Sequence, residues 1–543
     1  MKKNNFVEGM MIATLGIVLC KILGLIYVIP FYNIIGTKGG ALYSYAYSIY
    51  SIFLSLSISG IPTAISKIVS EYDELGYKNT KEKIYKISSK LINTIGFISF
   101  LVLFIFSSSI AKVIIGNITG GNTVEQVTIA IRLVSLALLI VPRLSLMRGY
   151  LQGHKYITPT SIAEVIEQLV RVIVIVAGSY VTVRVFNLSI ECAVYVAILG
   201  ASLGALTSYI FLKLKYKNYK DKTVYELKEE EKKFDKKYLL KQVIFYALPF
   251  VIIDLLKSAY GIVDSVTVVR TLVNIGYDIN TAETAFGVMA TWGTKLNMIV
   301  ISVSLGLTIS LVPNIASSMA KKDYNDVNTK INQSLKILLY TTLPMAFGIS
   351  FLATPIWNVF YGYSALSISI FRIFILQVVF FSLYTTVINL AQSMSETKIA
   401  LGSLLGSFLA KALLNIPMMY IVKYCGIDSY FGPTITNALV ELLTTIIVLS
   451  LLKKKYKFSY KETFDILLKI VLNIALMLGF LYILRLIINI PNTTRMLSLL
   501  NVIIYSLIGA TIYIFFTWKM GIIKDVFGDG VILKLKNKFF KSK

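Results

Sequence analysis

The chain has 543 residues, of which 56% are hydrophobic and 15% are charged. A soluble protein carries about 25% charged residues, so this composition excludes an ordinary soluble domain and predicts an all-α membrane protein with many spans. The net charge of +26 does not indicate a nucleic-acid partner. Its lysines lie in short connections between apolar segments, where they hold a membrane protein in its orientation.

Hydropathy predicts about fourteen transmembrane helices. The first has lysines before it, but it is too long for the apolar part of a signal peptide and has no small-residue cleavage site. Even-numbered connections are basic and odd-numbered ones nearly lack Lys and Arg, which predicts that both termini are cytoplasmic. In chain order the predicted spans are roughly 9–31, 40–66, 88–115, 127–147, 158–181, 192–212, 240–270, 285–313, 333–359, 367–391, 398–421, 432–452, 464–488 and 498–518.

One connection is long enough to divide the chain. Residues 213–239 are predicted to form a basic, solvated, cytoplasmic linker between a six-helix lobe, 1–212, and a second six-helix lobe, 240–452. Residues 453–543 add two helices and a basic cytoplasmic tail.

The two lobes resemble each other as an internal repeat. Three pairs share one offset of 240 residues: Arg132 and Arg372, Gln152 and Gln392, and Arg171 and Lys411. An even number of spans in each unit makes the repeats parallel, related by an axis along the membrane normal, and predicts a central cavity between them.

Ionisable residues inside predicted spans are costly, so each is a candidate for a functional site. Lys21 and Lys295 have no acidic residue one turn away in their own helix. They predict a cationic cavity for an anionic headgroup, with Arg171 and Lys411 as further cavity cations. A polar or ion-coupling network is predicted from the remaining residues: Glu164, Glu167, Asp254, Lys257 and Asp264.

Two of these interpretations have alternatives. Glu164, Glu167 and Arg171 lie on one helical face, so they also fit a set of charges that neutralise one another and brace the helix. Asp254 and Lys257 are three residues apart and able to pair. The nearby Arg148, His154 and Lys155 are predicted to lie in a loop and to hold the topology.

The sequence contains no HExxH motif, no Walker A loop and no GxSxG in a usable context. Its single His and three scattered Cys predict no metal site and no disulfide framework. We therefore expect a protein that is not an enzyme and has no cofactor, with transport drawing on a Na⁺ or H⁺ gradient or on the membrane potential. The alternatives are an ion-coupled multidrug exporter and a membrane glycosyltransferase or polymerase, for which Asp278 and Glu283 are the candidate carboxylates.

Two stretches carry a resemblance to a known family: LGLIYVIPFYNIIGTKGGALYSYAYSIYSIFLSLSISGIPTAISK and RGYLQGHKYITPTSIAEVIEQLVRV. They resemble bacterial polysaccharide-biosynthesis transporters, in particular the stage V sporulation protein B group, allied to lipid II flippases of the MviN type. All belong to the multidrug/oligosaccharidyl-lipid/polysaccharide exporter superfamily.

The resemblance implies a multi-pass protein of the bacterial inner membrane with two six-helix lobes around a cationic cavity. Its implied activity is to flip an undecaprenyl-pyrophosphate-linked cell-wall or polysaccharide precursor, with two added helices forming a groove for the polyprenyl tail. The implied partners are this lipid-linked glycan and membrane lipids. Lys21 matches a basic position of the flippase pattern, whereas Tyr27 and Val28 stand where that pattern has an Arg-Asp pair.

Overall fold

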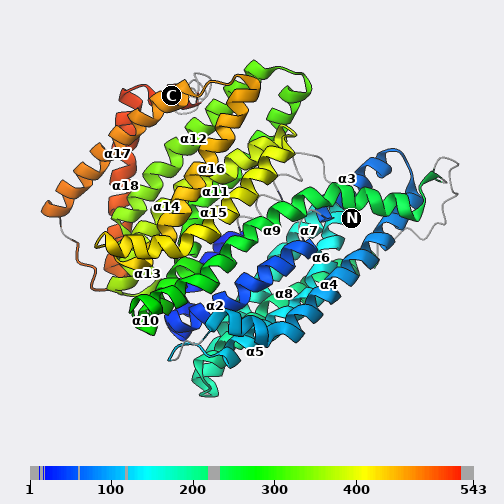
Figure 1. Cartoon of the computed structure of the whole chain (residues 1–543), viewed down its shortest axis with the longest axis horizontal. Helices are drawn as coiled ribbons and strands as arrows, with labels where there is room; N and C mark the ends of the chain where they lie inside the picture. Colours follow the sequence, from blue (N-terminus) through cyan, green and yellow to red (C-terminus); the bar gives the residue numbers. More distant parts are fainter. Residues whose placement is uncertain are drawn as a thin grey trace, which may run out of the picture. The chain divides into compact units, whose positions relative to one another are not determined.

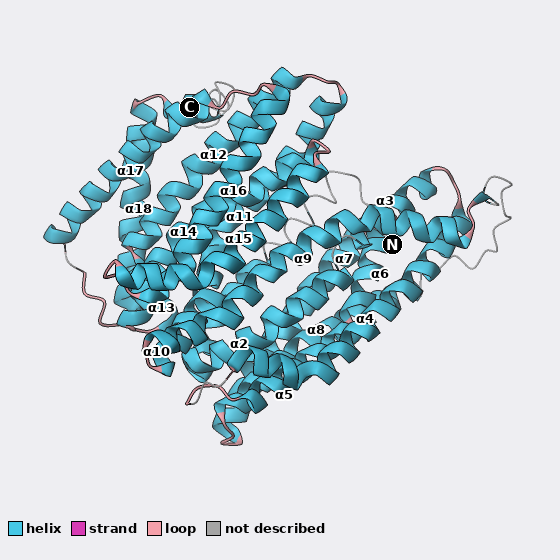
Figure 2. Ribbon diagram, viewed as in Figure 1, coloured by secondary structure: helices cyan, strands magenta, loops and turns pink. Residues whose placement is uncertain are grey.

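The computed structural model describes residues 12, 16, 19–58, 61–116, 120–217, 231, 233–488 and 490–527. These residues are helices joined by short connections, with no strand among them (Figure 2). The chain divides into two compact units, Met1–Thr291 and Trp292–Lys543. The predicted all-α class is confirmed.

The first unit is built on α2, against which several other helices pack. α7 packs along α8, α3 packs on α6, and α9 lies along both α2 and α4 (Figure 1). In chain order its helices are the segment Leu19–Ile26, α2 (Val28–Ile58), α3 (Ile61–Glu74), α4 (Lys78–Ile115), α5 (Val124–Ser135), α6 (Val141–Gly153), α7 (Ile157–Ile173), α8 (Ile190–Lys217), α9 (Lys236–Ile275) and α10 (Ile279–Gly287).

The second unit is centred on α14, which packs on α11, α12 and α16. The last two long helices, α17 and α18, pack on each other and join the unit through α12 and α13, around buried residues such as Ile470, Met477 and Tyr513. Its helices are α11 (Gly293–Ala320), α12 (Tyr324–Phe351), α13 (Ala353–Tyr361), α14 (Ala365–Ser393), α15 (Thr397–Tyr424), α16 (Gly432–Tyr456), α17 (Lys461–Ile487), α18 (Arg495–Lys519) and α19 (Ile522–Phe527).

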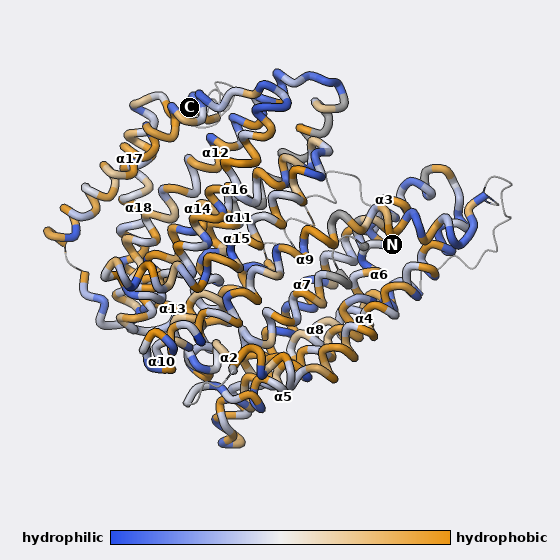
Figure 3. Tube along the Cα trace, viewed as in Figure 1, coloured by the Kyte–Doolittle hydropathy of each residue, from blue (hydrophilic) through white to orange (hydrophobic). Residues whose placement is uncertain are grey.

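The helices have the length and composition of membrane spans. Within the described part of the chain nine pass as spans, or up to eleven when each of two bent pairs counts as one. Apolar residues follow the middle of the helices, while hydrophilic residues gather toward helix ends and connections (Figure 3). Large apolar side chains such as Ile487, Leu507 and Trp518 remain exposed, as expected for surfaces that contact lipid. The predicted multi-span membrane protein is confirmed.

Several spans are broken rather than straight. Leu19–Ile26 and Val28–Ser55 meet at 48°, and Gly36, inside α2, has φ 64° and ψ −164°, a conformation that favours glycine. Lys236–Leu248 and Val251–Ile275 meet at 43°, next to Pro249, which has no N–H for the helical ladder. α7 continues into two π-helical turns, Val174–Gly178 and Val181–Val185, and such turns are frequent at functional sites.

The end of the basic linker belongs to the folded unit. Glu231 is 1% exposed, and its Oε1 accepts hydrogen bonds from the N–H of Thr80 at 3.0 Å and from the Thr80 hydroxyl at 2.9 Å. Thr80 lies in the first turn of α4, where free N–H groups and the helix dipole favour a negative charge. The prediction of a solvated linker is therefore wrong for Glu231, while residues 218–230 and 232 fall outside the described ranges.

The other end of α4 is capped by α9. Arg270 donates from Nε to the carbonyl oxygen of Ile114 at 3.0 Å and from Nη2 to that of Lys112 at 2.9 Å. A cation is favourable at these last carbonyls because the helix dipole is negative there. Since Glu231 precedes α9 and Arg270 belongs to it, α9 is fixed to α4 at both ends, inside the first unit.

Candidate functional site

An ionic cluster joins α6, α7 and α8 in the first unit. Glu167 of α7 receives two arginines: Nη2 of Arg171 donates to its Oε1 at 2.6 Å, and Nη2 of Arg148 donates to its Oε2 at 2.8 Å. The three side chains are 14%, 30% and 18% exposed, respectively. Charge-assisted bonds of this length are among the strong ones in proteins, so the cluster fixes the face of α7 that the sequence predicted.

Arg148 does not lie in a loop. It belongs to α6, and its Nη2 also donates to Oγ of Ser208 on α8 at 2.9 Å, while Ser208 donates to the carbonyl oxygen of Ala163 on α7 at 2.7 Å. The predicted loop position of Arg148 is therefore wrong, because α6 extends to Gly153 and the side chain of Arg148 contacts Glu167. The basic loop begins only at His154.

Close packing of α7 on α8 depends on two glycines. A Cβ on Gly204 would lie 2.6 Å from the carbonyl oxygen of Glu167, and one on Gly200 would lie 3.1 Å from that of Arg171. Small residues four apart allow two helices to approach closely in a membrane. Sequence reasoning missed this contact, although the GASLG signal at residues 200–204 could have revealed it.

The segment that carries Lys21 runs along α7. A Cβ on Gly16 would lie 3.3 Å from Cβ of Ser161, and one on Gly24 would lie 3.5 Å from Nε2 of Gln168, so the segment runs beside α7. Cys20, next to Lys21, is close enough to both glutamates of α7 to interact with their charges. Lys21 is half-buried at this contact.

The first helix bends directly after this segment. Tyr27 is 5% exposed and Val28 is fully buried, at the 48° break. The ring of Tyr27 lies 6.2 Å from that of Phe31, which lies 5.6 Å from the ring of Tyr43. Where the flippase pattern has an Arg-Asp pair, this chain therefore has an apolar and aromatic packing site.

Tyrosines of α2 form one wall beside the cluster. Tyr43, Tyr47 and Tyr50 recur at helical spacing, and all three interact electrostatically with Arg171. The rings of Tyr43 and Tyr47 are stacked with centroids 4.3 Å apart. The cluster thus combines guanidinium groups, carboxylates and aromatic surfaces, an arrangement suited to binding a polar, charged group.

The other predicted polar residues of the first unit lie on α9. Nζ of Lys257 is 4.0 Å from Oδ1 of Asp254, and both side chains are more than a third exposed, so this pair contributes little to stability. Asp264 is half-buried beside Ser265, whose hydroxyl is 2.7 Å from that of Ser48 on α2. Asp264 lies about 10 Å from Lys257 and about 15 Å from Asp254 along the helix axis, so the three do not form one cluster.

In the second unit Lys411 is almost completely buried on α15, with 1% of its surface exposed. Glu441 of α16, which packs on α15, is also buried, and its Oε2 accepts a hydrogen bond from Nε2 of Gln377 on α14 at 2.5 Å. Lys295 is half-buried on α11. Sequence reasoning missed Glu441, although a lone carboxylate in an apolar span was a signal.

The two candidate carboxylates for a transferase have structural partners. Asp278 caps α10, accepting from the N–H of Thr281 at 3.1 Å. Glu283 is 2% exposed, and its Oε1 accepts from the backbone N–H of Asn122 at 2.7 Å and from its side chain at 2.8 Å. Burial raises the pKa of the Glu283 carboxyl, and the bonds from Asn122 oppose this. Each of the two carboxylates is thus held by a backbone N–H group.

Residues 6–276, about half of the chain, match the family described as polysaccharide biosynthesis protein. The chain belongs to this family. Among relatives of this family member, lipid II flippase MurJ of Bacillus subtilis (strain 168) is 28% identical over 537 residues, covering 97% of each chain. Stage V sporulation protein B of the same organism is 22% identical over 373 residues, 68% of this chain and 69% of the relative. The motifs favoured the sporulation group, whereas the match to MurJ is longer and has the higher identity.

Two solved structures show the fold of this family member. Lipid II flippase MurJ in an inward closed conformation has a TM-score of 0.69 at 16% identity, covering 94% of this chain and 99% of that one. An inward-facing multidrug resistance MATE family transporter of the MOP superfamily has a TM-score of 0.64 at 13% identity, covering 82% and 98%. The chain therefore shares the fold of these two transporters.

Proposed function

We propose that this protein is a flippase that moves an undecaprenyl-pyrophosphate-linked cell-wall or polysaccharide precursor, of the lipid II type, from the inner to the outer leaflet of the bacterial cell membrane by alternating access. The observation that carries the proposal is the relation to lipid II flippase MurJ, which extends over 97% of both chains. A match of that extent relates whole transporters rather than one shared module.

In the proposal Lys21, Arg171, Lys295 and Lys411 supply positive charge for the pyrophosphate. Cations inside spans normally face a cavity or a partner, and a cavity lined by this charge suits an anionic group. Because Lys411 is 1% exposed, the substrate reaches it only after α15 and α16 rearrange.

The wider arrangement belongs to the same proposal: fourteen helices, two parallel six-helix repeats, both termini cytoplasmic, and no catalytic activity. Transport draws on a Na⁺ or H⁺ gradient or on the membrane potential. Moving one elementary charge across a potential of 100 mV changes the free energy by about 2.3 kcal/mol. Glu164, Glu167, Asp254, Lys257 and Asp264 are the groups through which coupling would act.

A second candidate, an ion-coupled multidrug exporter, is favoured by one observation, the likeness in fold to the MATE transporter at a TM-score of 0.64. The two candidates differ in the charge of the cargo. An exporter of cationic drugs needs acidic groups that face its cavity, whereas Glu167 already accepts bonds from two arginines.

The test is a translocation assay with the purified chain in proteoliposomes that contain lipid II or another undecaprenyl-pyrophosphate-linked sugar. We expect the parent to move at least one of them, and Lys21→Ala and Lys295→Ala to lose at least nine-tenths of the rate. Lys398→Ala, an exposed lysine at the start of α15, is the matched control and should keep it.

Parental rates in both variants would refute the assignment of the cavity cations. If the parent moved no lipid-linked sugar but extruded a cationic dye under an imposed Na⁺ or H⁺ gradient, the exporter would replace the flippase.

A further inference from the structure

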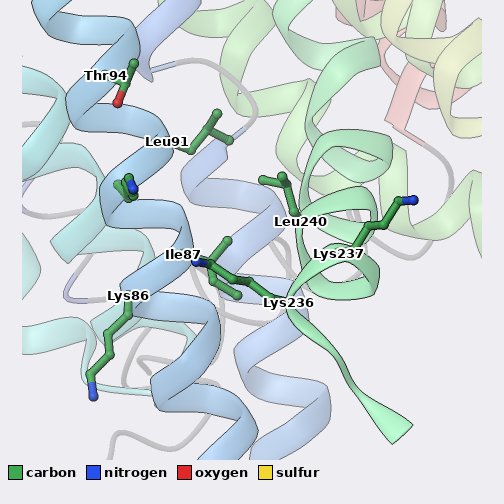
Figure 4. Close-up of a pocket in the computed structure, with 8 residues that line it drawn as sticks. Lys86, Ile87, Leu91, Thr94, Lys236, Lys237 and Leu240 are labelled. Carbon is green, nitrogen blue, oxygen red and sulfur yellow. The ribbon is translucent and has the colours of Figure 1, made fainter.

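A cavity of about 690 Å³ lies between α4 and α9 in the first unit, and none of its lining residues belongs to the candidate site (Figure 4). Half of the lining residues are lysines, and no carboxylate occurs among the described residues that line it. From α4 the cavity is lined by Lys86, Ile87, Lys90, Leu91 and Thr94, and from α9 by Lys236, Lys237 and Leu240.

The lining separates an apolar floor from a charged rim. In Figure 4, Ile87, Leu91 and Leu240 point toward the space between the helices, while Lys86 and Lys237 extend outward on opposite sides. The four lysines are exposed, and no ion pair within the described chain joins any of them to a carboxylate. Lysine side chains are long and flexible, so their ammonium groups reach an anion seated at the rim.

The position of the lysines along α4 matches the surface of a bilayer. Residues 91–111 carry no charge, and they rise about 32 Å at 1.5 Å per residue, close to the thickness of a hydrocarbon core of about 30 Å. Lys86 and Lys90 directly precede this stretch, which places them at the level of lipid headgroups.

Exposed apolar residues continue from the cavity along both helices. On α4 the face of Ile87, Leu91 and Thr94 goes on through Ile98 and Ile105, which are 53% and 64% exposed. On α9, Leu240 is followed at helical spacing by the exposed Ile244 and Leu248. We call these two runs the apolar stripes.

The frame of the cavity is fixed at both ends. Glu231 holds the start of α4, and Arg270 of α9 holds its last carbonyls. A bound molecule therefore meets a preformed groove, which lowers the entropy lost on binding.

We infer that this cavity binds an anionic phospholipid, with its headgroup phosphate among Lys86, Lys90, Lys236 and Lys237 and an acyl chain along the apolar stripes. Each lysine near an anionic headgroup strengthens binding, and the stripes favour a lipid over a free phosphate. The site extends beyond the proposed function, since it holds a membrane lipid at the protein surface rather than the transported one.

The test uses the full chain in a nonionic detergent, with bound lipids counted by native mass spectrometry. We expect dioleoyl-phosphatidylglycerol to bind at least ten-fold more tightly than dioleoyl-phosphatidylcholine. The variant K86Q/K90Q/K236Q/K237Q should lose this preference. The control K398Q/K453Q/K454Q/K461Q removes four exposed lysines of the second unit and should keep it.

Two results would overturn the inference. An equal loss in the control would show attraction to the net charge of the protein instead of a site. Displacement of phosphatidylglycerol by an equal concentration of inorganic phosphate or glycerol 3-phosphate would assign the cavity to a free phosphate.

A second variant keeps the test decisive if the lysine variant does not fold. I98A/I105A changes two exposed residues, so it should fold normally. It should weaken the dioleoyl lipid at least three-fold and leave dihexanoyl-phosphatidylglycerol unchanged. Equal affinities of parent and variant for both lipids would contradict the placement of the acyl chain.

Discussion

Glu167→Gln is expected to destabilise the first unit, because it leaves Arg148 and Arg171 without their shared carboxylate. An amide oxygen still accepts one bond, but the negative charge between two guanidinium groups is lost. Removing one partner of a fully buried ion pair costs about 3–5 kcal/mol. The side chains are 14–30% exposed, so we expect about 3 kcal/mol. At roughly 2–4 °C per kcal/mol, the thermal midpoint should fall by about 6–12 °C.

The assay is thermal unfolding of purified protein in detergent, with Glu125→Gln as the matched control. Glu125 is exposed in the first turn of α5, where a negative charge contributes about 0.3–1 kcal/mol, so its variant should lose no more than about 4 °C. Adding Arg171→Gln to Glu167→Gln removes one of the two stranded charges and should recover part of the loss. A parental midpoint for Glu167→Gln, or additive losses in the double variant, would refute the reasoning.

Two further predictions concern packing and pH. Gly204→Leu should lower the thermal midpoint or prevent folding, because even a Cβ would lie 2.6 Å from the carbonyl oxygen of Glu167. The control Gly402→Leu, with open space around it, should fold normally. Equal behaviour of the two variants on size exclusion and in thermal unfolding would contradict this. Burial raises the pKa of the Glu283 carboxyl, although the bonds from Asn122 oppose this. The folded protein therefore favours the protonated carboxyl. The resulting stabilisation is fully present below the ordinary glutamate pKa and is lost as the pH rises through the folded-state pKa. Glu283→Gln should therefore raise the thermal midpoint at pH 7.5 and change it little at pH 4; an equal shift at both values would count against a buried, ionising carboxyl.

The sequence predicted the helical membrane class and the position of most helices, because a run of about 20 apolar residues is typical of a membrane-spanning helix. It also placed Glu167 and Arg171 on one face, because the 3.6-residue period fixes neighbours within a helix. The ends of helices were less predictable. α6 extends to Gly153 and carries Arg148 inside the unit, although a positive charge in a short connection looks the same in the sequence.

Contacts between helices distant in sequence could not be predicted from periodicity. Glu231 sits in a run of lysines and acids that resembles a solvated linker, but a buried carboxylate is stable where the free N–H groups of α4 receive it. Arg270 marks the end of a span in the sequence, while in the structure it caps another helix. Both residues join α9 to α4, and neither pairing has a local signal.

The residues around Arg171 in the first unit differ from those around Lys411 in the second. At the offset that aligns Arg171 with Lys411, Glu167 aligns with Ser407, whose hydroxyl is 3.2 Å from that of Tyr384. The acid of the first unit therefore lies one turn from its arginine, whereas the buried acid Glu441 of the second unit belongs to the neighbouring helix α16. The positive charge recurs at this offset and the acid does not. A pairing along one helix follows from the helical period, as for Glu167 and Arg171, whereas packing between neighbouring helices, as for α15 and α16, does not.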